Sequence, residues 1–327
     1  MSAPPVSAES LELDRPPFAV VAALGPEQVA DEMVACFARL GARPDRLEHA
    51  HALALQSIAT ADDGKGGDRA VAKGAKAGGK GSDTAGGKGG AQGKGAPPMD
   101  ALARAGRAIA RDIDRGVGVG VAAGYHNPQH FLEVMLSTRY LARLVALDAR
   151  RSACVVTAGL IHDFHHDGSR GASAPFRLEL LALEKAAPYL NEAGVDAETR
   201  ASLEALVLAT EPRTGVPYAR ACWLHHRGLA GAAARSPGLP RGIELLARDA
   251  EFAADAVLLA EADVLPSIGL TLAHADKLQA RLAAEWGVAL GRDDKLQFID
   301  RMVSEIAVAK FFIPNVQRLR QSYARAA

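Results

Sequence analysis

The stretch GLIHDFHHDG, residues 159–168, places three histidines and two aspartates directly behind an apolar run. The adjacent His162 and Asp163 offer an imidazole nitrogen and a carboxylate oxygen, a pair that zinc, iron and manganese bind readily. His165 and His166 follow about one helical turn later, so at least one of them can return to the same face. Because so many polar groups are costly to bury unless something binds them, the stretch indicates a metal site.

The composition favours a helical protein without a targeting segment. Among 327 residues, 38 basic side chains balance 38 acidic ones, so no overall field points to nucleic acid or to an anionic membrane. Ala, Leu, Arg and Glu dominate the periodic regions, which favours helix over strand. The three scattered cysteines suggest no disulfide framework, and we expect neither a signal peptide nor a membrane span. We therefore expect a cytoplasmic protein that acts on a small molecule; the sequence does not indicate an oligomeric state.

The chain divides into three parts by composition. Residues 1–58 form an N-terminal helical segment that we expect to pack on the rest, after a loose tail over residues 1–17. Residues 59–98 are rich in Gly, Lys and Ala, with almost no large apolar groups, which predicts a flexible linker. A weaker interpretation makes this segment a basic tether for nucleic acid or acidic lipid. Residues 99–327 carry the chemistry.

Helical periodicity recurs throughout the two outer parts, with no convincing strand pair. Helices are predicted over residues 24–40, 46–58, 99–113, 128–144, 175–190, 197–210, 243–259, 270–286 and 295–314, with a further one carrying the histidine-rich stretch.

Two further features share the chemistry of that stretch. His126 and His130 lie four residues apart at the start of the predicted helix 128–144, so both can face the same way. Asp263 follows the long apolar helix 243–259, an unusual place for a carboxylate without a ligand. The resulting order, H…HD…D, resembles the HD superfamily of metal-dependent phosphohydrolases.

The local motifs resemble more closely the catalytic domain of the class I cyclic nucleotide phosphodiesterases. YHNPQH at 125–130 is similar to that family's YHNxxH, and IHDFHHDG at 161–168 is similar to its HDxxHPG. Shorter matches follow in the right order: ATE at 209–211, AD at 262–263 and FID at 298–300. This resemblance spans roughly residues 100 to 320. It implies an all-α, multi-helical HD-type domain.

The resemblance also implies a ligand set for two divalent metal ions. His130, His162, Asp163 and Asp263 would hold the tighter ion, which is usually zinc in the family. Asp163 would bridge to a second ion, usually magnesium or manganese. Two metals suit a phosphodiester, because they neutralise its charge and lower the pKa of a bound water.

Further roles follow from the same resemblance. His126 would be the general acid that protonates the leaving oxygen, a task that suits a histidine with a pKa near neutrality. His166 would orient metal-bound water, and Phe298 would stack on the base. Plainer interpretations remain open: His126 could only cap its helix, and Phe298 could be a core residue.

Several positions depart from the family pattern. Lys295 stands where the family has a glutamine that hydrogen-bonds the purine, and a lysine suits an additional phosphate better. His165 replaces an aspartate, Asp167 a proline, and Glu211 the aspartate of AT-D, which leaves Glu211 either a helix-end charge or a pocket residue. The family's ENHH segment has no clear counterpart. The metal centre therefore matches the family better than the base pocket does.

The leading prediction is a metal-dependent phosphodiesterase that hydrolyses a 3′,5′-cyclic nucleotide, cAMP or cGMP, to the 5′-monophosphate. An HD-family phosphohydrolase of another nucleotide or phosphoester is the alternative, motivated by Lys295. A di-iron oxygenase of HD type, motivated by His165 as an extra ligand, and a catalytically silent binding module complete the set.

Overall fold

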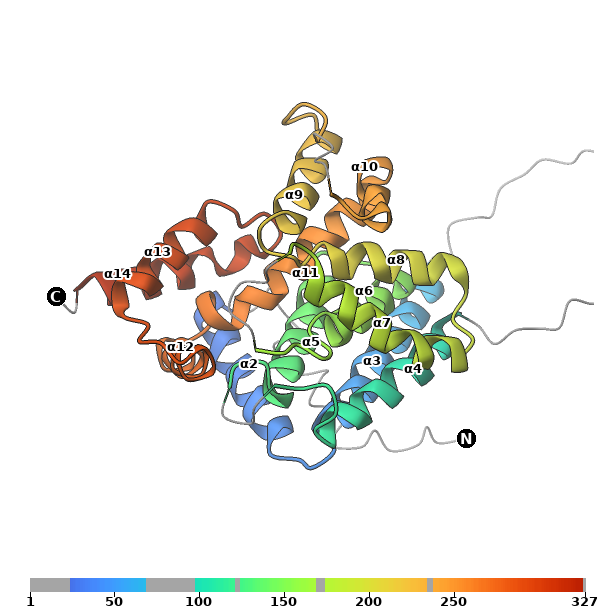
Figure 1. Ribbon diagram of the computed structural model, residues 1–327, viewed down its shortest axis with the longest axis horizontal. Coiled ribbons are helices and arrows are strands. Elements are labelled where there is room, and N and C mark those ends of the chain that lie inside the picture. Colours follow the sequence, from blue (N-terminus) through green and yellow to red (C-terminus); the bar gives the residue numbers. More distant parts are fainter. Residues whose placement is uncertain (1–23, 69–97, 121–123, 169–173, 234–237, 326–327) are drawn as a thin grey trace, which may run out of the picture.

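The computed structural model describes residues 24–68, 98–120, 124–168, 174–233 and 238–325 (Figure 1). These residues form helices, turns and loops without a strand, which confirms the predicted all-α class. The predicted tail over residues 1–17 and most of the Gly/Lys/Ala-rich segment lie outside the described residues. The elements are α2 (Pro26–Gly41), α3 (Arg46–Asp68), α4 (Pro98–Asp114), α5 (Pro128–Leu144), α6 (Ala149–Ile161), α7 (Arg177–Glu192), α8 (Ala197–Leu208), α9 (Gly215–His226), η2 (Arg241–Glu244), α10 (Leu245–Arg248), α11 (Ala250–Ile268), α12 (Leu272–Trp286), α13 (Arg292–Val303), η3 (Ala309–Phe312) and α14 (Ile313–Arg325).

Capping side chains fix where the central helices begin. The Asn127 side chain accepts hydrogen bonds from the backbone N–H groups of Gln129 and His130, and Pro128 occupies the first turn of α5. Asp148, Asp196 and Asp249 cap α6, α8 and α11 in the same way. These caps satisfy backbone donors that a helix start otherwise leaves without partners.

Helix α5 lies at the centre of the molecule and packs against α6 and α11 (Figure 1). Its residues from His130 to Ala142 are all buried, which is the pattern of a helix surrounded on every side. Helices α2 and α3 contribute Val29, Phe37 and Leu47 to the same core. The Asp114 carboxylate of α4 also accepts the N–H of Leu47 at 3.0 Å. The division at residues 59 and 98 stays a prediction.

Three predicted helix boundaries are wrong. Helix α3 continues beyond the expected end at Ile58, to Asp68. The expected helix 243–259 breaks at Asp249, whose backbone is extended (φ −132°, ψ 116°) and whose side chain caps α11. Because α11 then runs to Ile268, Asp263 lies within this helix and not after its end.

The expected helix 295–314 is interrupted as well. Helix α13 ends at Val303, and a new helix begins at Ile313, with Pro314 in its first turn. The carboxylate of Glu261 accepts hydrogen bonds from the backbone N–H groups of residues 307–309 in the link between them. A tertiary contact therefore holds this segment away from helical geometry.

Helices α13 and α14 pack around a small hydrophobic cluster of their own, away from the main core. It contains Ile268, Ala275, Ile299, Val316 and Leu319, with Tyr323 beside them. In Figure 1 these two helices project to one side of the central bundle, beyond α11 and α12. Ile268 at the end of α11 and Ala275 of α12 belong to this cluster, and α14 also contacts α2.

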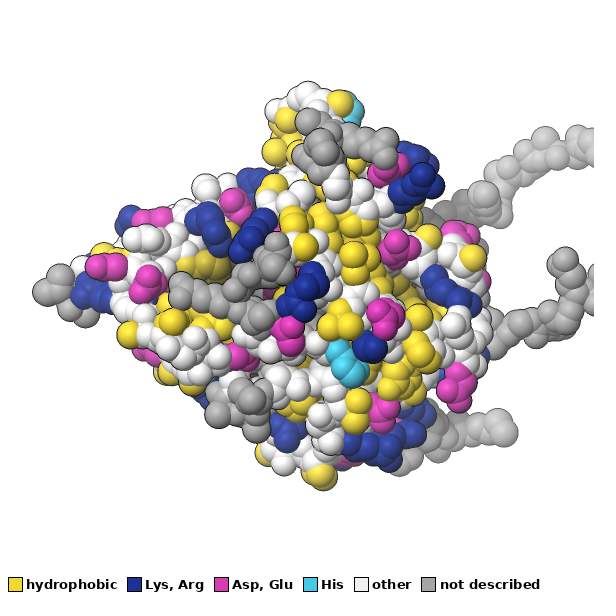
Figure 2. Space-filling view, in the orientation of Figure 1, with side chains coloured by type: hydrophobic (Ala, Val, Ile, Leu, Met, Phe, Trp, Pro, Cys, Tyr) yellow, Lys and Arg dark blue, Asp and Glu magenta, His cyan; other side chains and the backbone are white. Residues whose placement is uncertain are grey.

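The surface is mixed in charge. Figure 2 shows basic and acidic side chains interspersed on the face in view, in keeping with the balanced totals. Within the described part of the chain, no single helix is long and apolar enough to cross a membrane. The pair α11 and α12 passes the same test of length and composition, but the chain bends by 101° between these two helices.

Candidate metal centre

Four side chains from three helices converge on one point. His130 stands in the first turn of α5, His162 caps the C-terminal end of α6, Asp163 follows it, and Asp263 projects from the middle of α11. One ligand atom of each lies within 4.8 Å of the others. The structure therefore brings together the four residues that the sequence predicted as metal ligands.

Within this group, imidazole nitrogens and carboxylate oxygens face one another, and His130 Nε2 is hydrogen-bonded to Asp163 Oδ2. The Nε2 atoms of His130 and His162 both lie 3.0 Å from Asp163 Oδ2 and 3.5 Å from Asp263 Oδ1. The Nδ1 atom of His162 lies 2.9 Å from the carbonyl oxygen of Gly159, which can only accept. Nδ1 therefore carries a proton, and Nε2 faces two carboxylates, to which it donates in the imidazolium form; in the neutral form its lone pair can bind a metal ion.

Such an arrangement calls for a cation. The Nε2 atom of His162 is buried and has no hydrogen-bond partner among the described residues. Burial alone would lower the pKa of His162, yet Asp163 and Asp263 raise it well above the usual value. The donor set of two imidazoles and two carboxylates suits zinc, iron or manganese. The residues present therefore fit a divalent metal ion.

His126 lies beside this group and faces Glu285, a partner that the sequence did not reveal. Its Nδ1 atom lies 2.5 Å from Glu285 Oε1, and its backbone N–H donates to Glu285 Oε2 at 2.9 Å. Since a carboxylate accepts, Nδ1 carries a proton, and Nε2 is left facing Asp163 Oδ2 at 3.6 Å. Burial opposes ionisation of His126, but Asp163 and Glu285 together raise its pKa.

His166 completes a second group with His126 and Asp163. The two imidazole rings stack at 3.6 Å between centroids. The backbone N–H of Gly168 donates to Nδ1 of His166 at 3.0 Å, so the neutral ring carries its proton on Nε2. His165, by contrast, belongs to neither group; its backbone turns into the left-handed region (φ 66°) and its N–H bonds to Gly118.

These groups open into a cavity of about 220 Å³. The residues that line it come from α7, α11, α12 and the segments before α5, after α6 and after α8. They are Tyr125, His126, His162, Asp163, His166, Leu178, Glu179, Thr210, Glu211, Pro212, Arg213, Asp263 and Trp286.

Two glutamates add negative charge to this cavity. Glu179 of α7 is buried, and burial, with Asp163 and Glu211 nearby, raises its pKa to about 7. No motif marked this residue. Glu211 accepts the backbone N–H groups of Thr214 and Gly215 at 2.6 and 3.0 Å, so it caps the start of α9 and also lines the cavity. Both of its predicted roles therefore coexist.

Lys295 and Phe298 are not brought to this cavity. Both lie on α13, where Lys295 is buried and Phe298 packs against the C-terminal cluster. The Lys295 Nζ atom lies 5.8 Å from the centroid of the Phe298 ring, and burial lowers the pKa of Lys295 to about 8. The aromatic side chains lining the cavity are instead Tyr125 and Trp286.

Comparison with solved structures identifies the fold. The chain is similar to the phosphodiesterase domain of a rhodopsin–phosphodiesterase fusion protein from the choanoflagellate Salpingoeca rosetta, with a TM-score of 0.51 and 17% identity over 68% of this chain and 83% of that one. A second structure of the phosphodiesterase domain of the same organism's rhodopsin phosphodiesterase gives a TM-score of 0.52 and 17% identity over 68% and 80%. No protein-family model and no curated protein matches the sequence. The chain thus has the fold of a phosphodiesterase domain.

Proposed function

We propose that this chain is a cytoplasmic, metal-dependent phosphodiesterase that hydrolyses a 3′,5′-cyclic nucleotide to the 5′-monophosphate. One observation supports the proposal: the imidazoles of His130 and His162 and the carboxylates of Asp163 and Asp263 converge within 4.8 Å of one another, beside the His126–Glu285 pair and at a cavity. A cation site next to a proton donor is what hydrolysis of an anionic ester requires. The likeness in fold to phosphodiesterase domains agrees with it.

The residues divide the work as follows. His130, His162, Asp163 and Asp263 would hold zinc, and Asp163 would also contact a second ion, magnesium or manganese. When bound, these ions neutralise the phosphate charge and lower the pKa of a water molecule. Glu211 supplies further negative charge in the cavity, as does Glu179 above its pKa of about 7, and this charge favours a second divalent cation.

In this proposal His126 donates a proton to the leaving oxygen. Its Nδ1–H is held by Glu285, so Nε2 faces the cavity and can carry the proton that departs. The carboxylate of Glu285 stabilises the imidazolium form and fixes the orientation of the ring. His166 stacks on His126 and, with its Nε2–H donor, would orient water.

A second candidate, an HD-family phosphohydrolase of another phosphoester, is favoured by the rest of the cavity. Phe298, which would stack on the base, packs on the C-terminal cluster with Lys295 beside it, whereas the exposed Arg213 lies at the rim of the cavity. A guanidinium binds an additional phosphate better than it binds a purine edge. This candidate keeps the same metal ligands and changes only the substrate.

The test joins metal analysis to a substrate screen on the full chain. We expect zinc in the purified protein, and turnover of cAMP or cGMP once magnesium or manganese is added. Asp163→Asn should lower this rate more than about a thousandfold, because it removes a metal ligand. Asp167→Asn is the matched control: its carboxylate bonds to Arg177 outside the cavity, so the rate should change less than about threefold.

Other outcomes separate the candidates. Metal-loaded protein that releases phosphate from nucleoside mono- or triphosphates, but leaves cyclic nucleotides intact, would favour the second candidate. Protein that binds no zinc, iron or manganese under any condition would overturn both.

A further inference from the structure

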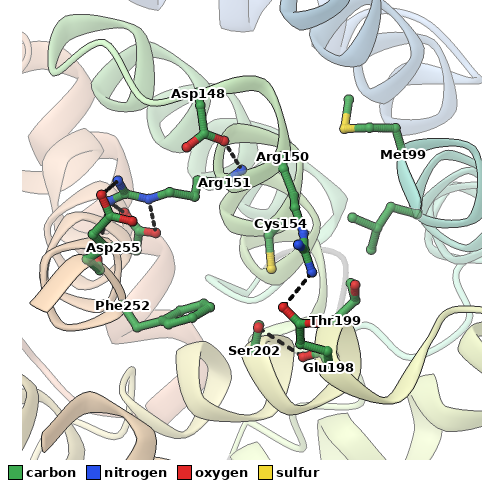
Figure 3. Close-up of a pocket in the computed structure, with 12 residues that line it drawn as sticks. Met99, Asp148, Arg150, Arg151, Cys154, Glu198, Thr199, Ser202, Phe252 and Asp255 are labelled. Carbon is green, nitrogen blue, oxygen red and sulfur yellow. Dashed lines mark hydrogen bonds and ion pairs between the residues drawn. The ribbon is translucent and has the colours of Figure 1, made fainter. Parts of the chain in front are cut away.

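A second cavity, of about 240 Å³, lies at the other end of the helices that carry the metal centre (Figure 3). It is formed by the first turns of α6, α8 and α11, together with the start of α4. It shares no lining residue with the 220 Å³ cavity beside the candidate metal centre, called the metal cavity below. Any ligand bound here is therefore separate from the proposed phosphoester substrate.

The floor of this cavity is apolar. Cys154 and Leu102 are 6% and 1% exposed, and the Met99 and Phe252 side chains form opposite walls (Figure 3). The Cys154 thiol lines the cavity and makes no hydrogen bond to any residue that the structure describes. Burial raises its pKa to about 12, so it remains a neutral thiol and not a nucleophile. The floor therefore suits the apolar part of a ligand.

The cationic groups of the wall are already engaged. Arg151 donates to both oxygens of Asp255 at 2.9 and 2.7 Å and pairs with Glu251 at 3.1 Å. Arg150 pairs with Glu198 at 2.8 Å. Each guanidinium thus has its own carboxylate, and little donor capacity is left for an incoming anion.

Acceptors, in contrast, remain in excess. Asp148, Glu198, Glu251 and Asp255 provide four carboxylates against two guanidinium groups, and each carboxylate oxygen keeps a further lone pair. The hydroxyl of Ser202 donates to the Glu198 carbonyl oxygen, so it can still accept.

The positive N-terminal ends of the helices do not turn the cavity into an anion site. Asp148, Asp196 and Asp249 each accept a backbone N–H of their own helix, at 2.8 to 2.9 Å. These carboxylates occupy the sites at which an anion would bind a helix N-terminus and offset the positive end of the helix dipole. These contacts therefore favour an occupant with hydrogen-bond donors over an anion.

We propose that this cavity is a binding site for a small organic cation: an ammonium or amidinium group on a compact apolar body. The apolar part lies against Cys154, Leu102 and Phe252, and the cation reaches the carboxylates at the rim. The volume equals that of roughly eight waters at about 30 Å³ each, which limits the ligand to about ten non-hydrogen atoms. The wall carries no metal-ligand cluster and no reactive nucleophile, so the site binds a ligand without transforming it.

The experiment compares three probes of one shape on the full chain, by titration calorimetry. They are phenethylamine, neutral 2-phenylethanol and anionic phenylacetate. We expect phenethylamine to bind with a dissociation constant of about 1 mM or tighter. The neutral and anionic probes should bind at least about tenfold more weakly, because they lack the donor cation. Equal binding of phenylacetate, or no binding of phenethylamine, would overturn the proposal.

Two variants locate the bound probe. Cys154→Leu fills the floor, and the double variant Glu198→Gln with Glu251→Gln removes rim charge at exposed positions that keep their shape. Each should weaken phenethylamine binding at least about tenfold. If Cys154→Leu fails to fold, the double variant still tests whether phenethylamine binds in this cavity. An unchanged affinity of the double variant for phenethylamine would mean that the probe binds elsewhere, which would overturn the proposal. Asp163→Asn should bind phenethylamine as the parent does, so the result does not depend on the proposed enzymatic activity.

Discussion

Two cavities of similar volume, about 220 and 240 Å³, lie at opposite ends of the same helices. They differ in how the charged side chains that line them are paired. Helices α6 and α8 begin at the second cavity and end at the metal cavity, and α11 runs past both. At the second cavity each guanidinium has a carboxylate partner. At the metal cavity, two imidazoles and two carboxylates crowd together, and the buried Nε2 atom of His162 has no hydrogen-bond partner among the described residues. Charged groups are thus paired with opposite charges at the second cavity, whereas this buried nitrogen lacks such a partner at the metal cavity, where a functional site is expected.

Helix direction contributes to the same contrast. The negative ends of α6 and α8 point to the metal cavity, where they favour a cation. Their positive ends lie at the second cavity, where Asp148 and Asp196 cap them. The folded backbone itself therefore prepares one end for a metal ion, and side chains neutralise the other.

Removing the metal should separate the two cavities most strongly. We expect chelation by EDTA to lower phosphodiester hydrolysis more than about a thousandfold, because the activated water and charge neutralisation are lost. The melting temperature should also fall, since a ligand that binds only the folded state stabilises it. Phenethylamine titrated into the chelated protein should bind within about twofold of its original affinity. A loss of binding there would mean that the two cavities form one cooperative unit.

Removing one aspartate from each cavity should change stability unequally. Asp255→Asn leaves Arg151 without its buried partner, and we expect a cost of about 2–3 kcal/mol in the free energy of unfolding. Asp263, which is 28% exposed, faces two imidazoles in a group crowded with carboxylates. In chelated protein, Asp263→Asn should cost less than about 1 kcal/mol. Urea titrations of the two variants measure both values, and equal costs would contradict the contrast.

A smaller effect is expected at the proton donor. Glu285→Gln keeps the shape of the side chain but removes the charge that stabilises the His126 imidazolium. We expect kcat to fall about tenfold, with the metal content and KM nearly unchanged. Glu251→Gln, the same substitution at the second cavity, should leave kcat within about twofold. An unchanged kcat in Glu285→Gln would reduce this glutamate to a structural contact.

Much of this organisation could be predicted from the sequence, because its signals are local. The stretch 159–168 already carries adjacent metal ligands, and Asn127-Pro128 marks the start of α5. Spacing places His126 and His130 on one side of that start. The structure joins these residues with Asp263, as expected, although Asp263 lies inside α11 and not after it.

The features that the sequence did not predict depend on contacts between distant segments of the chain. Glu285 is a single carboxylate on an amphipathic helix, and only the fold brings it to His126. Glu179 lies in a region where the expected motif is missing, so no pattern pointed to it. The link after α13 is held by Glu261, far back in α11. One local signal was available there: Pro314, which suits the first turn of a new helix.

The smallest expected effect tests the position of α13. If the substrate contacts only the residues that line the metal cavity, Phe298→Ala should change KM and kcat less than about threefold, a difference below about 0.7 kcal/mol. Trp286→Ala, the comparison on α12, removes an aromatic wall of the cavity and should raise KM about tenfold. The reverse result, a raised KM in Phe298→Ala alone, would mean that α13 moves over the cavity when substrate binds. Lys295 would then approach the substrate with it, because the two side chains lie on the same face of α13, and the base pocket implied by the family resemblance would form only in the bound state.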